Sequence, residues 1–200
     1  MDNVEYIKNY LSEMKDVIDK INSEDIAGVV DALFTAWKNG NQVFLIGNGG
    51  SASTATHMAC DLNKCTIVEG KKRMKALALV DNIPIVSALT NDDGWGEIYV
   101  EQLKNFFNAG DVVIAFSVHG GSGSDKAGAW SQNLLKGLQY VKDNGGVAIG
   151  VSGFDGGAMK QMADHCIVTP VESTPHSESL HVAVEHLVTN CLKEKIVNEG

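Results

Sequence analysis

The predicted fold rests on one stretch of the chain, Val43-Phe44-Leu45-Ile46-Gly47-Asn48-Gly49-Gly50-Ser51. Its first four residues are all apolar, as expected of a strand that is covered on both faces of a parallel sheet. The glycine-rich residues that follow lead directly into a helical segment that begins near Ala52. A buried strand, a tight turn and a helix form the repeating unit of layered α/β folds.

The same pattern recurs along the chain. Four further apolar runs predict strands, at 76–80, 112–116, 147–151 and 166–168. The segments around them are long enough for helices, at 51–64, 84–90, 95–107, 125–143, 156–163 and 177–196. Alternating strands and helices predict an α/β fold, a three-layer αβα sandwich with a five-stranded parallel sheet.

Two amphipathic segments, 4–20 and 24–38, precede the first strand. Each carries apolar residues at three- and four-residue spacing, which predicts a helix. No repeat or linker interrupts the sequence, so we expect a single domain over 1–200. Within it, residues 41–200 form the α/β core, and the helices of residues 1–40 turn apolar faces toward an oligomer partner.

Composition excludes several classes of protein. The net charge is −9, and no basic run exceeds Lys71-Lys72-Arg73, which argues against a nucleic-acid partner. No apolar run reaches 18 residues, so no membrane span is expected. The four cysteines form no C-x-x-C pair and the N-terminus has no apolar leader, which indicates a cytoplasmic protein with reduced thiols.

Two glycine- and serine-rich loops follow predicted strands, at 47–51 and 117–124. In parallel sheets, ligands bind at the carboxyl ends of the strands. Backbone amides and the start of a helix can hold an anion there, although the first loop alone is equally explained as a tight turn. Arg73 is the chain's one arginine, so such a site suits a sugar phosphate better than a nucleoside triphosphate.

Histidines and carboxylates cluster in two helical segments. His57 and Asp61 lie four residues apart, on one helix face, as a metal pair, an acid/base pair or a surface ion pair. The last helix is denser, with five such residues within eleven positions: His176, Glu178, His181, Glu185 and His186.

Glu178, His181 and Glu185 share one face of that helix, whereas His186 lies about 80° around from Glu178 and ~12 Å further along the axis. Glu178 and His186 therefore reach one ion only if Glu178 lies at or before the helix start, or if two subunits contribute. A solvated charged face is the alternative, but the apolar neighbours of these residues indicate partial burial, and buried polar groups need partners.

Four motifs together resemble the sedoheptulose 7-phosphate isomerases (phosphoheptose isomerases). They are the 47–51 loop with His57 and Asp61, the segment 90–94 followed by Ile98-Tyr99, the segment 110–112 leading into Ser117 and Ser122, and Glu178-Ser179-Leu180-His181 with His186. The resemblance covers nearly the whole chain and keeps the order and spacing of all four sites.

The resemblance implies the sugar isomerase (SIS) fold, a homotetramer with active sites shared between subunits, and a zinc ion, Zn²⁺. It implies that sedoheptulose 7-phosphate is converted into a heptose 7-phosphate. Sugar phosphate contacts would fall on Asn48, Gly49, Gly50, Ser51, Asp61, Asn91, Asp92, Ser117, Val118, His119, Ser122 and Glu178. Zinc would be held by His57, Asp61, Glu178 and His186, with Asp61 and His186 also the proton-transfer pair.

The sequence departs from the family pattern in three ways. The family has glutamate where this chain has Asp61, and glutamine where it has Glu178, which adds negative charge near a cation. In the serine-rich loop Val118 and His119 remove two hydroxyls and Gly121 replaces an asparagine. A weaker hold on phosphate, or a different sugar, follows from the third departure.

The expected reaction is aldose–ketose isomerisation through an enediol, with Asp61 as the base and His186 as its partner. His119 would bind phosphate or help to open the sugar ring. Two alternatives are an isomerase of a different sugar phosphate and a non-catalytic SIS regulator that binds a protein partner. The intact set His57, Asp61, Glu178 and His186 separates an enzyme from a regulator, because a pure adaptor has no need for it.

Overall fold

The computed structural model describes residues 2–121 and 131–199. Its centre is a sheet with the strand order β2-β1-β3-β4-β5, in which every neighbouring pair is parallel. The strands are β1 (Val43–Gly47), β2 (Ala76–Ala78), β3 (Val112–Ser117), β4 (Val147–Gly153) and β5 (His165–Thr169). The predicted five-stranded parallel sheet is therefore confirmed.

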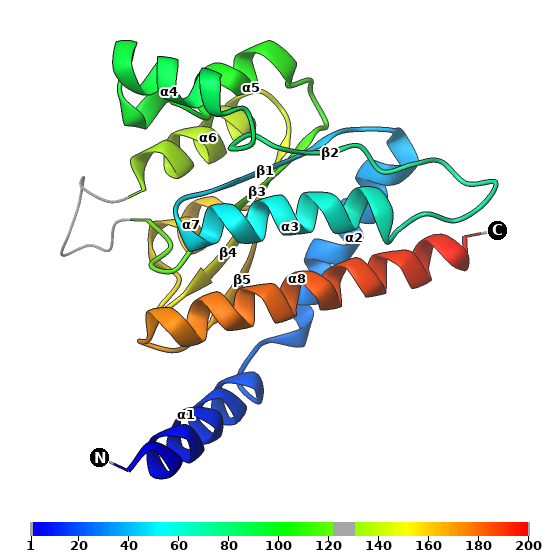
Figure 1. The fold of residues 1–200 in the computed structure, drawn as a ribbon. Coiled ribbons are helices and arrows are strands. Elements are labelled where there is room, and N and C mark those ends of the chain that lie inside the picture. Colours follow the sequence, from blue (N-terminus) through cyan, green and yellow to red (C-terminus); the bar gives the residue numbers. More distant parts are fainter. Residues whose placement is uncertain (1, 122–130, 200) are drawn as a thin grey trace.

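Helices cover both faces of this sheet (Figure 1). One face carries α2 (Ser23–Asn39), α3 (Gly50–Lys64) and α8 (Thr174–Val197). The other carries α4 (Ile83–Asp92), α5 (Val100–Phe106), α6 (Gln132–Asp143) and α7 (Gly157–Met162). This arrangement is the predicted three-layer sandwich. Within the described ranges, no helix is both long and apolar enough to span a bilayer.

The two cores alternate along each strand. In β1, Val43 and Leu45 pack against α2, α3 and α8, whereas Phe44 and Ile46 pack against α5 and α6. All four side chains are fully buried. Because successive side chains of a strand point to opposite faces, a run that is apolar throughout supplies both cores at once.

The ends of several elements differ from the sequence prediction. The expected helix over 95–107 is a short 3-10 turn, Trp95–Glu97, followed by α5. The last helix begins at Thr174, three residues earlier than predicted, with Pro175 in its first turn, where a missing N–H costs nothing. Of the helix expected over 125–143, residues 125–130 lie outside the described ranges, and the rest is α6.

The N-terminal helix α1 (Asn3–Ile18) projects away from the sandwich (Figure 1). Val17 at its end is buried, but five of its apolar side chains are more than half exposed: Val4, Tyr6, Ile7, Leu11 and Ile18. Tyr10 touches the body of the protein, where its ring stacks on His176 at 3.9 Å between centroids. The helix therefore forms as predicted, but its apolar stripe lies outside the core of its own chain.

Candidate active site

The first loop turns the chain from β1 into α3 with a geometry that requires glycine. A side chain at Gly47 would place its Cβ 2.4 Å from the carbonyl oxygen of Ser51. Gly49 has φ 57° and ψ −125°, a conformation that residues with a Cβ rarely adopt. Gly49 also caps α3 without a side-chain hydrogen bond. The amides of Ser51 and Ala52 donate to the carbonyl oxygens of Asn48 and Gly49 at 3.1 and 3.0 Å, so a ligand at this end of the helix is met mainly by the positive end of the helix dipole.

A pocket of about 150 Å³ lies at the carboxyl ends of β1 and β3. Six of the predicted substrate residues line it: Asn48, Ser51, Ser117, Val118, His119 and Glu178. None of the described lining residues is a lysine or an arginine. Any anion here is therefore met by hydroxyls, an imidazole, backbone amides and the positive end of α3.

Asn48 is held by a residue that the sequence reasoning missed. Asn48 Nδ2 donates to Asn133 Oδ1 at 2.9 Å, and Asn133 Nδ2 donates back to Asn48 Oδ1 at 2.8 Å. Asn133 is fully buried at the start of α6, and its Oδ1 also accepts from the Leu134 amide. This reciprocal pair fixes the direction of the Asn48 amide at the edge of the pocket.

The remaining predicted substrate residues lie elsewhere. Gly50 lines a second pocket of about 320 Å³ between α3 and α8, together with His57 and Glu178. Asn91 and Asp92 are exposed at the end of α4, where Asn91 donates to Asp92 at 2.6 Å, and neither lines the two pockets. Ser122 lies outside the described residues.

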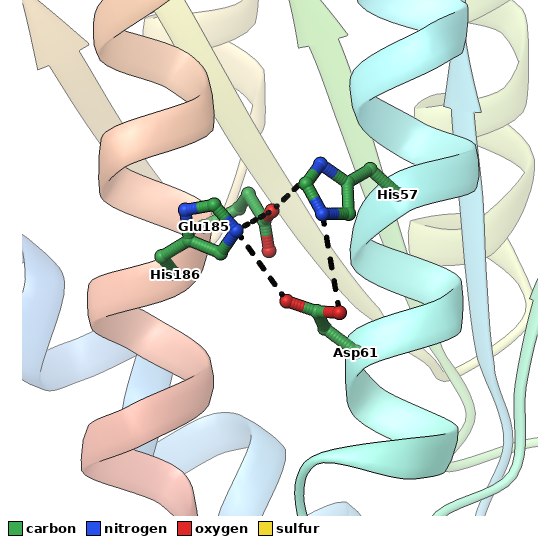
Figure 2. A group of neighbouring side chains, drawn as sticks. All are labelled: His57, Asp61, Glu185 and His186. Atoms are coloured by element: carbon green, nitrogen blue, oxygen red, sulfur yellow. Dashed lines mark ion pairs between the residues drawn. The ribbon is translucent and has the colours of Figure 1, made fainter.

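Four ionisable side chains meet between α3 and α8 (Figure 2). His57 and Asp61 come from α3, and Glu185 and His186 come from α8. One ligand atom from each lies within 4.8 Å of all the others. His186 Nε2 is 3.6 Å from Asp61 Oδ2 and 3.3 Å from Glu185 Oε1, and His57 Nδ1 is 3.4 Å from the same Glu185 oxygen.

One side of the cluster is exposed to solvent and the other side is buried. The imidazoles of His57 and His186 are about half exposed, whereas the side chain of Glu185 has no exposed surface. Burial, and secondly the charge of Asp61, raises the pKa of Glu185 to about 8. A carboxyl group in this position takes up a proton near neutral pH unless a cation compensates its charge.

The donor set fits a metal ion such as zinc. Two imidazoles and two carboxylates are among the ligands that zinc prefers. Both oxygens of Glu185 are buried and receive no well-directed hydrogen bond from the described residues, which is the environment that a cation relieves. Three of the four predicted metal ligands, His57, Asp61 and His186, are thus brought together.

Glu178, the fourth predicted ligand, is not part of this group. Glu178 lies inside α8, in the second turn. It could bind the same ion as His186 of its own chain only if it lay at or before the start of the helix, and it does not. Its carboxylate instead packs against the start of α3, where a Cβ on Gly50 would fall 2.3 Å from Glu178 Oε1. Glu178 lines both pockets and so joins the strand-end pocket to the one that reaches His57.

His181, which shares a face of α8 with Glu178 and Glu185, is buried against the sheet. Its ring lies 6.3 Å from that of Phe116, and burial lowers its pKa to about 4. Its neutral ring contributes to the core beneath the site.

Residues 5–129 match the family model described as an SIS domain. This chain belongs to the SIS domain family. Phosphoheptose isomerase 2 of Campylobacter jejuni is 32% identical over 165 residues, which are 82% of this chain and 77% of that protein. The lincomycin biosynthesis protein LmbN of Streptomyces lincolnensis is 40% identical over 187 residues, which are 92% of this chain and 67% of LmbN.

Solved structures show the same fold. A phosphoheptose isomerase from Neisseria gonorrhoeae superposes with a TM-score of 0.85 at 22% identity, covering 96% of this chain and all of that one. The predicted SIS fold and the predicted membership of the phosphosugar isomerases are therefore confirmed.

Proposed function

We propose that this chain interconverts sedoheptulose 7-phosphate and a heptose 7-phosphate through an enediol, with zinc in the site. The observation that carries the proposal is that the strand-end pocket and the pocket between α3 and α8 share a lining residue. Glu178 lines both the strand-end pocket and the pocket that reaches His57. A substrate with a phosphate at one end and a carbonyl at the other would occupy both. The phosphoheptose isomerase relatives favour a seven-carbon sugar.

The phosphate end is bound at the carboxyl ends of β1 and β3. Ser51 and Ser117 supply hydroxyls, His119 supplies an imidazole, and the start of α3 supplies the positive end of its helix dipole. These groups are neutral or weakly basic, so the site tolerates the chain's net charge of −9. Gly49 and Gly50 let the substrate approach the backbone closely.

The reacting end lies between α3 and α8. Asp61 removes a proton from the carbon beside the carbonyl, and His186, 3.6 Å from Asp61, moves the proton of the neighbouring hydroxyl. Asp61 is partly buried, which brings a carboxylate to the substrate without full exposure to water. A zinc ion, when bound, would polarise the carbonyl oxygen and stabilise negative charge on it.

We also propose a cytoplasmic homotetramer in which α1 packs against other copies of the chain. The exposed apolar stripe of α1 supports this assembly, because such surface is rarely left in water. Replacing Ile7 and Leu11 with glutamate should dissociate the tetramer in light scattering. A double variant of unchanged mass would contradict the role of α1.

A second substrate is favoured by one specific finding. The relative that is 40% identical is named for lincomycin biosynthesis and not for a heptose phosphate. Val118 and His119 also give the pocket fewer hydroxyls than the serine-rich loop of the resembling family. An isomerase of a different sugar phosphate therefore competes with the heptose assignment, whereas the cluster in Figure 2 argues against a purely protein-binding regulator.

The deciding experiment is an isomerisation assay with ketose phosphates of five to seven carbons, run with zinc and after removal of metal by a chelator. Turnover of the seven-carbon substrate that is lost on chelation and restored by zinc is the expected result. Preference for another ketose phosphate would move the assignment to that sugar. No turnover of any member of the series would reject the isomerase proposal.

A further inference from the structure

Two glutamates on α8 lie seven residues apart, which is about 10.5 Å along a helix, and their surroundings differ. Glu185 is fully buried among ionisable groups, and Oε1 is within 3.4 Å of a nitrogen of His57 and of one of His186. Glu178 is more accessible and faces the glycine turn at the start of α3. The two residues have the same chemistry, so their positions decide their roles.

The distances around Glu185 match those of ligands that share one ion. Zinc binds nitrogen and oxygen at about 2.0–2.1 Å in a tetrahedron, which places neighbouring ligand atoms about 3.4 Å apart. The distances from Glu185 Oε1 to His186 Nε2 and His57 Nδ1 are 3.3 Å and 3.4 Å, and the distance from His186 Nε2 to Asp61 Oδ2 is 3.6 Å. These three separations match a shared ion, and one ligand atom from each of the four side chains lies within 4.8 Å of all the others, so the widest pairs would close by up to about 1.4 Å around a cation.

Charge points the same way. The carboxylates of Asp61 and Glu185 together carry the two negative charges that neutralise a divalent cation. If Asp61 were the only carboxylate ligand, the metal centre would keep a net positive charge. The carboxylate of Glu185, which has no contact with water, would then be buried next to the centre without binding the ion. Neither Glu185 oxygen has a well-directed hydrogen bond among the described residues, and the close polar contacts of Glu185 there are those with His57 and His186, the two imidazoles of the same cluster.

We propose that Glu185 is the fourth metal ligand in this chain and that Glu178 contacts the substrate without binding the metal. The proposal deepens, and rests on, the isomerase function above. The metal centre is then complete within one subunit, formed by His57, Asp61, Glu185 and His186 (Figure 2). Glu178 is left beside Gly50, where its carboxylate accepts hydrogen bonds from sugar hydroxyls between the phosphate and the reacting carbons.

Zinc titration of the metal-free protein tests this assignment without any substrate. The variants are Glu185→Gln and Glu178→Gln, each of which removes one charge and keeps the shape of the side chain. Glu194→Gln is the matched control, since Glu194 is exposed on the same helix. Zinc affinity is measured by competition with a chelating dye, and bound zinc by elemental analysis.

Glu185→Gln should weaken zinc binding by about 100-fold or more, because even hydrogen-bond partners of ligands contribute about 10–100-fold. Glu178→Gln and Glu194→Gln should stay within about twofold of the parent chain. Cobalt(II) offers a second readout, since the visible spectrum of its four-coordinate complex should change in Glu185→Gln alone. The KM for the ketose phosphate should rise in Glu178→Gln.

Loss of zinc affinity in Glu178→Gln, with Glu185→Gln unaffected, would overturn the proposal in favour of a shared centre. Equal losses in both variants, or no loss in either, would also overturn it. Because the titration contains no sugar, its result is independent of the proposed reaction. A chain that binds zinc through Glu185 but turns over no ketose phosphate would keep this inference and lose the isomerase proposal.

Discussion

The strand-end pocket and the cluster between α3 and α8 are neighbours, but they are built by different means. The pocket is shaped by backbone at Gly47 and Gly49, and by small polar side chains such as Ser51 and Ser117. The cluster is made of four ionisable side chains from two helices. Changes in the pocket should therefore act mainly through shape and stability, and changes in the cluster mainly through charge and turnover.

The largest expected effect is in the cluster. Asp61→Asn should lower kcat by about 1,000-fold, because positioned bases typically contribute 10²–10⁴-fold. The loss should persist at saturating zinc, while circular dichroism and the melting temperature stay close to those of the parent chain. Measurement of kcat on the preferred ketose phosphate checks this. Retained activity would remove Asp61 from the mechanism.

In the pocket, Gly47→Ala should destabilise the fold by about 3 kcal/mol, because overpacking against rigid backbone costs about 1–3 kcal/mol or more. The new Cβ would lie 2.4 Å from the Ser51 carbonyl oxygen. Gly96→Ala is the matched control, since its nearest neighbour, 3.4 Å away, is the flexible Lys136 ammonium. Urea denaturation of both variants should separate them clearly. Equal stabilities would show that the turn at Gly47 adjusts easily.

A smaller effect should follow from Asn133→Asp. The change removes the hydrogen bond that Asn133 Nδ2 donates to Asn48 Oδ1 at 2.8 Å. It also places a carboxylate oxygen against that amide oxygen. Leaving a buried polar group without its partner costs about 1–3 kcal/mol. Since Asn48 lines the pocket, KM should rise more than kcat falls. A change in kcat alone would indicate that Asn133 does not act through Asn48.

The most gradual effect is a dependence of stability on pH in the metal-free protein, spread over several pH units. The pKa of Glu185 is about 8 in the folded chain, against an ordinary value of 4.5 that applies to the unfolded chain. Between these two pH values the folded chain therefore binds more protons than the unfolded chain. Stability should therefore fall as the pH rises from about 5 to 8, with a slope of at most about 1.4 kcal/mol per pH unit. The difference in urea stability between the parent chain and Glu185→Gln isolates this contribution. Parallel pH profiles for the two would contradict it.

The sequence predicted the sheet and the first loop well, because both depend on local patterns. Continuous apolar runs mark buried parallel strands. The glycines at 47, 49 and 50 mark a turn in which a Cβ would clash at Gly47 and Gly50 and in which Gly49 adopts a positive φ. His57 and Asp61 were also found by a local rule, since residues four apart share a helix face. These three predictions needed no knowledge of tertiary packing.

The role of Glu185 was beyond such rules. Neighbouring residues on a helix point about 100° apart, so the spacing of Glu185 and His186 gave no sign that both would meet one partner. The side chains of Glu185 and His186 both reach α3 because α3 packs against the part of the α8 surface that lies between them (Figure 2). That packing cannot be read from the spacing of residues in α8. Asn133 was missed for a similar reason, since 85 residues separate it from Asn48. Asn91 and Asp92, in contrast, were predicted from family resemblance and lie outside both pockets of this chain.

α3 and α8 run side by side in the same direction (Figure 1). Gly50 and His57 are seven residues apart on one helix, and Glu178 and Glu185 are seven apart on the other, so each helix takes two turns between the two regions. The two regions are therefore separated by the same distance along both helices. Under the proposed function, a sugar phosphate that spans both regions would place its reacting carbons about two helical turns from its phosphorus, so the length of its carbon chain would decide whether both ends meet their partners.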